Sequence, residues 1–131
     1  MNTRWLMIIS AVTLGAAGII LTFMPKEIAQ FLNMPEPTSF IFQILGALYV
    51  GFAMLNWTAK ANIMGGIYSR PVALGNFTHF LIGVLALMKM AVHDSHWSIG
   101  WLFAIPYALF TLLFGLVLFA HPAAINKTPI Q

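Results

Sequence analysis

Residues 99–120 read IGWLFAIPYALFTLLFGLVLFA, an apolar run without a charged side chain. A helix needs about 20 such residues, each rising 1.5 Å, to cross the hydrocarbon core of a bilayer. Three further runs of similar length and composition lie at 5–24, 39–57 and 72–92. None of them alternates between polar and apolar residues as the strands of a membrane barrel do. The sequence therefore predicts four transmembrane helices.

The composition of the whole chain agrees with this prediction. Of its 131 residues, 60% are hydrophobic and only 7% are charged, whereas soluble domains contain roughly 25% charged residues. So few charges cannot cover the surface of a soluble domain. We therefore expect residues 1–131 to form a single all-α domain, an integral membrane bundle of four transmembrane helices.

Residue content also excludes several functions. The chain has no cysteine, so disulfides, thiolate metal ligands and cysteine nucleophiles are absent. Its net charge of +3 comes from basic residues dispersed beside the apolar runs, and we expect no nucleic acid partner. No Asp or Glu falls within a predicted span, which argues against a four-helix proton-coupled exporter. We recognise no catalytic or cofactor-binding motif and expect neither an enzyme nor a cofactor.

The loop after the first span carries a helical pattern of its own. Pro25 is suited to the first position of a helix, where its missing N–H is harmless. Apolar residues then recur at helical spacing, at Ile28, Phe31 and Leu32. We predict a short helix lying in the membrane interface, ended by Pro35 and Pro37.

Charge predicts the orientation of the four helices. Four of the six basic residues lie at the two termini and in the second loop: Arg4, Lys60, Arg70 and Lys127. The other two, Lys26 and Lys89, fall on the opposite side and are outnumbered. The acidic residues lie in the first and third loops: Glu27, Glu36 and Asp94. Four crossings put these two groups on opposite sides of the membrane. Because basic loops stay in the cytoplasm, we expect a multi-pass protein of the inner, cytoplasmic membrane with both termini cytoplasmic.

Small residues mark the expected contacts between helices, since lipid provides no hydrophobic drive for them to associate. The first span offers Ala11, Gly15 and Gly18. The second offers Gly46, Ala47, Gly51 and Ala53, and the third places Gly75, His79 and Gly83 on one stripe. We interpret these stripes as packing within the chain, with a dimer face as the alternative.

Polar side chains inside the spans suggest one candidate site. Asn76 and His79 share a face of the third span, and Tyr49 and Tyr107 reach a similar depth from the second and fourth. Together they predict a polar pocket for a ligand. The alternative is that His79 hydrogen-bonds a neighbouring helix and serves packing alone. Arg70 either anchors the helix to lipid phosphate or holds an anionic headgroup or ligand near Asn76.

The third loop contains His93, Asp94 and His96. Two imidazoles and a carboxylate this close could bind a divalent cation such as Zn²⁺. The spacing matches no standard metal site, however, and no fourth ligand is evident. We expect a solvated turn and no bound metal.

Two stretches, GALYVGFA at 46–53 and RPVALGNFTHF at 70–80, carry a resemblance to a known group of proteins. With the length and hydropathy of the chain, they resemble small four-helix bacterial inner-membrane proteins of the DoxX-like kind. The resemblance implies a bacterial four-helix bundle without an assigned activity. The cysteine chemistry linked to some DoxX-like proteins does not carry over, because this chain has no cysteine.

The sequence thus favours an accessory or scaffolding subunit of a larger membrane complex. Its partners would be the lipid bilayer and other membrane subunits, or a second copy in a homodimer. The rival hypothesis is a binder or carrier of a small lipophilic molecule, such as a quinone, an isoprenoid or a lipid, near His79. A third hypothesis is an enzyme that acts on such a lipid, with His79 as acid or base.

Overall fold

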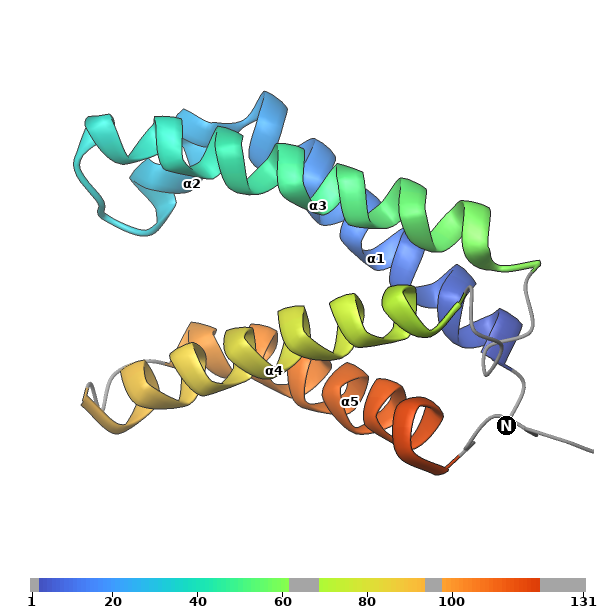
Figure 1. Cartoon of the computed structure of the whole chain (residues 1–131). Coiled ribbons are helices and arrows are strands. Elements are labelled where there is room, and N and C mark those ends of the chain that lie inside the picture. Colours follow the sequence, from blue (N-terminus) through green and yellow to red (C-terminus); the bar gives the residue numbers. More distant parts are fainter. Residues whose placement is uncertain (1–2, 62–68, 94–97, 121–131) are drawn as a thin grey trace, which may run out of the picture. The chain divides into compact units, whose positions relative to one another are not determined.

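The computed structural model describes residues 3–61, 69–93 and 98–120, and all regular structure within them is helical. The elements are α1 (Thr3–Phe23), α2 (Pro25–Phe31), the 3₁₀ turn η1 (Glu36–Thr38), α3 (Ser39–Ala59), α4 (Arg70–His93) and α5 (Ser98–Ala120) (Figure 1). Four of these helices, α1, α3, α4 and α5, are long and apolar enough to cross a membrane. The predicted all-α fold with four such helices is confirmed.

The ends of the four long helices lie within two residues of the predicted spans. The differences arise where polar residues continue a helix beyond its apolar run. Arg70 begins α4, and α3 continues through Thr58 to Ala59. Hydropathy marks the part of a helix that suits lipid, whereas backbone hydrogen bonds continue into the interface.

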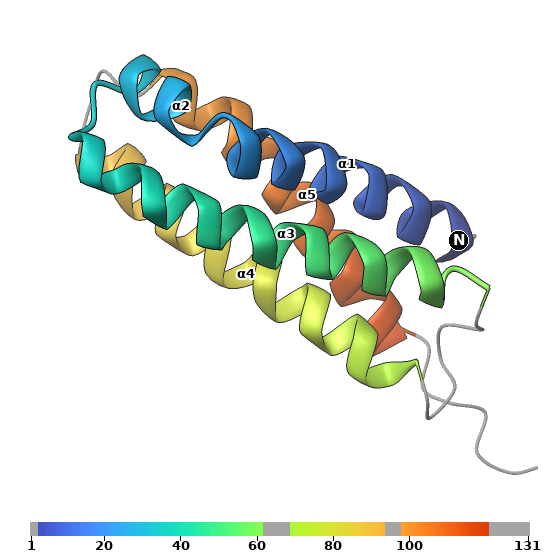
Figure 2. The same ribbon diagram turned by 90° about the horizontal axis from the view of Figure 1, so that it is seen from above.

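The chain divides into two compact units, Met1–Ala61 and Asn62–Gln131. In the first unit, α1 and α3 lie side by side and run in opposite directions (Figure 1). The second unit is the antiparallel pair of α4 and α5 (Figure 2). Each unit is therefore a helical hairpin, and we describe each by itself. The packing of all four helices into one domain stays a prediction.

The short helix after the first span is also confirmed, although it ends earlier than the two prolines. Pro25 stands at its start, and Asn33 adopts a left-handed conformation with φ of 53° just beyond its end. The Asn33 N–H donates to the Gln30 carbonyl and the Met34 N–H to the Ala29 carbonyl. This pair of bonds is the Schellman arrangement, whose left-handed position is usually Gly and sometimes Asn. The backbone of Asn33 thus ends α2 before Pro35 is reached.

Close approach of two glycines sets the spacing between α1 and α3. A Cβ added to Gly18 would lie 2.8 Å from the Gly46 carbonyl oxygen. A Cβ added to Gly46 would lie 2.8 Å from the Gly18 oxygen and would also collide with Thr22 Oγ1. Only hydrogen atoms fit at these positions. The predicted small-residue contact is therefore present at Gly18 and Gly46.

Gly51 departs from that prediction. A Cβ built at Gly51 meets nothing within 4 Å, and Ala47 is exposed as well. The contact with α1 follows Gly46 and Ala53, whose Cβ lies 3.5 Å from the Cβ position of Gly15. Ala47 and Gly51 are four residues apart and share one face of α3. Gly46 is adjacent to Ala47 and therefore lies on another face.

A buried polar pair joins the same two helices. Asn56 Nδ2 on α3 donates to Ser10 Oγ on α1 at 3.0 Å, and Ser10 Oγ donates to the Met7 carbonyl oxygen at 3.0 Å. Both side chains are fully buried. The bond fixes the register of the hairpin, since a polar group left unpaired in this apolar setting would cost free energy.

Gly46→Leu should destabilise the first hairpin, whereas Gly51→Leu should have little effect on its stability. Gly46→Leu must separate α1 from α3, and overpacking of this kind costs about 1–3 kcal/mol. Gly51→Leu adds the same side chain on the same helix in open space, so its effect should stay within about 1 kcal/mol. Unfolding of the detergent-purified protein, followed by circular dichroism, measures both. Equal losses in the two variants would contradict the described contact.

The Ser10–Asn56 bond can be measured by a double-mutant cycle. Ser10→Ala, Asn56→Ala and the double variant should show a coupling free energy of about 0.6–2 kcal/mol, typical of hydrogen bonds between membrane helices. The readout is the free energy of unfolding in detergent. Additive losses would mean that the two side chains do not stabilise each other.

Candidate functional site

The predicted polar stripe on the third span lies on α4, in the second hairpin. Asn76, His79 and Gly83 are spaced three and four residues apart, so they follow one side of the helix. Asn76 is fully buried, and its Nδ2 donates to the Val72 carbonyl oxygen at 2.9 Å. Asn76 thus satisfies part of its hydrogen-bonding capacity on its own helix.

His79 meets Tyr107 of α5, as the predicted pocket requires. Tyr107 Oη lies 3.5 Å from His79 Nε2, at the long limit of a hydrogen bond. The tautomer of the imidazole decides which of the two groups donates. Their ring centroids are 5.7 Å apart, so the two side chains also pack against each other. This pair is the part of the predicted pocket that the structure brings together.

An aromatic cluster surrounds the pair. Phe80 lies at its centre, with ring centroids 5.2 Å from Tyr107, 4.8 Å from Phe110 and 5.8 Å from Phe114. Phe80 and Phe114 are fully buried. Aromatic pairs at these separations contribute beyond their buried area, about 0.5–1.5 kcal/mol each in water-soluble proteins. The rings therefore form the contact between α4 and α5.

Gly83 allows this cluster to close. A Cβ added to Gly83 would collide with atoms Cδ1 and Cε1 of the Tyr107 ring. At the other end of the contact, a Cβ on Gly115 of α5 would lie 3.2 Å from Cε2 of Phe77. The second hairpin thus places a glycine opposite an aromatic ring, whereas the first places a glycine opposite a glycine.

Two other predicted residues lie outside this cluster. Tyr49 is half-buried on α3 and belongs to the first hairpin, so its place in the pocket stays a prediction. Arg70 is exposed at the first residue of α4. It stands about 9 Å along the helix axis from Asn76, at 1.5 Å per residue. The pair of His79 and Tyr107 is thus formed without Arg70.

The candidate metal site of the third loop lies mostly outside the described residues. Asp94 and His96 lie outside the described residues, and of His93 only the backbone, at the end of α4, is described. Elsewhere, within 3–61, 69–93 and 98–120, no three His, Cys, Asp or Glu side chains gather as a metal site would require.

Two features of the hairpins were not predicted from the sequence. One is the aromatic cluster, although Tyr107, Phe110 and Phe114 recur at helical spacing on the fourth span. The other is the role of Ser10. Ser10 is a polar residue inside the first apolar run, and in an antiparallel pair it reaches the depth of Asn56.

Comparison of the chain with protein-family models, with curated proteins and with solved structures gives no match. The resemblance to DoxX-like proteins therefore stays a prediction. The class of protein follows from the helices: four apolar spans indicate a small multi-pass membrane protein.

Alanine at Gly83 should disturb the second hairpin more than loss of the Tyr107 hydroxyl. Gly83→Ala must displace the Tyr107 ring, which we expect to cost about 1–3 kcal/mol. Tyr107→Phe keeps the ring and removes only one long hydrogen bond, so its cost should stay below about 1 kcal/mol. Unfolding in detergent compares the two variants. A larger loss of stability in Tyr107→Phe than in Gly83→Ala would show that the polar contact contributes more than the ring packing.

Proposed function

We propose that this small membrane protein is a non-enzymatic accessory subunit that packs against another membrane protein through one face of α3. Three residues define this face: Gln43, Ala47 and Gly51. They are spaced four apart and therefore share one stripe of the helix. Within the first hairpin all three are exposed, and the Cβ position of Gly51 is open. The exposed stripe is the observation that carries the proposal.

Another helix would suit this face. Gln43 lies four residues into α3 and carries an amide that can donate and accept hydrogen bonds with a polar side chain of a partner. Ala47 and Gly51 allow another helix backbone to approach closely, as small residues do at contacts within membranes. A helix with small residues and a polar side chain opposite Gln43 would satisfy both requirements. This is the chemistry that we expect of the partner.

The polar groups inside the two hairpins support the same proposal. Asn56 bonds to Ser10, and His79 lies against Tyr107, so these groups hold helices together. The half-buried His79 packs its ring against Tyr107 of the neighbouring helix, and this contact favours a packing role over binding of a lipophilic molecule.

The proposed subunit has both termini in the cytoplasm of a bacterial cell and spans its inner membrane. The distribution of basic residues supports this orientation, since four of the six lie at the termini and the second loop. The pairing of the spans as antiparallel hairpins agrees with an even number of crossings. Lys60 Nζ lies 3.0 Å from the ring centroid of Trp57 at the end of α3, and Lys and Trp are both typical of a membrane interface.

Leucine at Gly51 tests the proposal. The native protein, extracted in mild detergent, should travel with other chains at fixed stoichiometry in native mass spectrometry. Gly51→Leu should abolish this association, because the added side chain prevents close approach. Ala16→Leu, which adds bulk at an exposed position of α1, should leave it intact.

Two results would overturn the proposal. A homodimer that Gly51→Leu dissociates would make the face a contact between two copies of this chain. A monomer without other chains, unchanged by the substitution, would leave the face without a protein partner. The stability of Gly51→Leu, measured separately, distinguishes loss of the partner from loss of the fold.

A further inference from the structure

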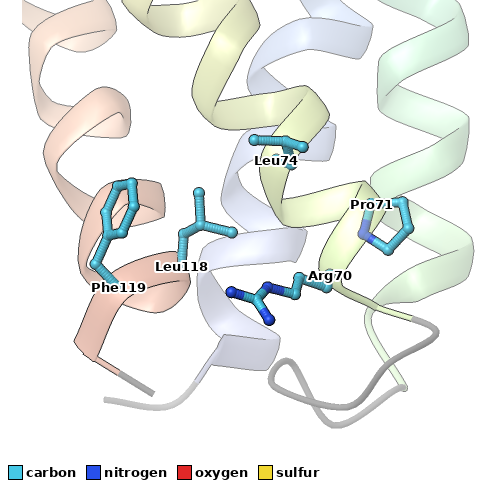
Figure 3. Close-up of a pocket in the computed structure, with 5 residues that line it drawn as sticks. All are labelled: Arg70, Pro71, Leu74, Leu118 and Phe119. Atoms are coloured by element: carbon cyan, nitrogen blue, oxygen red, sulfur yellow. The ribbon is translucent and has the colours of Figure 1, made fainter. Parts of the chain in front are cut away.

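A groove at one end of the second hairpin lies apart from the aromatic cluster. Its volume is about 480 Å³, within the range of small-molecule sites. The lining residues come from both helices: Arg70, Pro71 and Leu74 of α4, and Leu118 and Phe119 of α5 (Figure 3). The groove thus combines one cation with apolar walls.

Among the described residues of this hairpin, the charge of Arg70 has no acidic counterpart. The described residues of the unit, 69–93 and 98–120, contain no Asp or Glu. Arg70 is exposed, and Figure 3 shows its guanidinium extending from the start of α4 toward the end of α5. A guanidinium presents a planar set of N–H donors that match a phosphate or a carboxylate. The groove therefore suits an anionic group.

The position of the groove along the helices limits the kind of anion. Arg70 is the first residue of α4, and Phe119 is the last but one of α5. The ends of transmembrane helices lie at the level of the lipid headgroups. Leu74 is 51% and Phe119 71% exposed, so the apolar wall is open to an acyl chain. A soluble anion would contact Arg70 without using this wall.

We infer that the groove binds an anionic phospholipid, with its phosphate against Arg70 and the upper part of an acyl chain along Leu74, Leu118 and Phe119. The inference is independent of the proposed contact on α3, because every residue that carries it lies in the second hairpin. Binding would hold the ends of α4 and α5 at the membrane surface. The selectivity comes from charge, since zwitterionic lipids carry a cation that Arg70 repels.

Lys89 provides the matched control. It is the other basic residue in the described part of this hairpin, exposed near the opposite end of α4. It does not line the groove. Removing its charge changes the net charge of the protein by the same amount as removing that of Arg70. The comparison therefore separates a site from general attraction to anions.

Lipid titrations followed by native mass spectrometry test the inference. Phosphatidylglycerol should bind the unmodified protein more tightly than phosphatidylcholine. Arg70→Gln should weaken phosphatidylglycerol binding by roughly tenfold or more, as expected for loss of a charge-assisted hydrogen bond. Lys89→Gln should leave it within about twofold, and Phe119→Ala should weaken it through loss of van der Waals contact with the acyl chain.

Three outcomes would overturn the inference. Equal losses of phosphatidylglycerol affinity in Arg70→Gln and Lys89→Gln would show general attraction between the protein and anionic lipid, without a specific site. Equal affinity for phosphatidylglycerol and phosphatidylcholine would remove the role of charge. Displacement of the lipid by millimolar inorganic phosphate would identify the occupant as a soluble anion. Circular dichroism of each variant confirms that the helices are retained.

Discussion

The approach of Gly18 to Gly46 is the contact on which the first hairpin depends. In lipid, burying apolar surface between helices gains little, so association relies on close packing and on a few hydrogen bonds. Two glycines bring the α1 and α3 backbones near enough for both. The Asn56–Ser10 bond then becomes possible at 3.0 Å. A larger residue at Gly46 would weaken the packing and the bond together.

The second hairpin also depends on close packing between its helices, but aromatic rings provide most of the contact. Phe80 contacts Tyr107 and two phenylalanines of α5, and Gly83 leaves room for the Tyr107 ring. Aromatic rings supply large contact areas with few rotatable bonds. The polar edge of this cluster is His79 against Tyr107. The two hairpins thus each combine a glycine contact with one polar pair.

One exposed feature of each hairpin carries a proposal about function. The face of Gln43, Ala47 and Gly51 is partly polar and built from small residues, which suits another helix. The groove at Arg70 has a cation at one end and apolar walls, which suits an anionic lipid. Each feature lies away from the polar pair of its own hairpin. An accessory subunit would need such surfaces because its interior is occupied by packing.

The sequence by itself determined the four spans and the short helix at Pro25, because hydropathy over about 20 residues decides what lipid accepts. It also indicated the small-residue contacts, but it could not separate Gly46 from Gly51. Only the tertiary structure decided which of them faces α1, since that depends on the rotation of each helix about its axis. The same rotation decided that His79 meets Tyr107. Composition carries no information about the rotation of a helix about its axis, whereas the contacts between two helices depend on that rotation.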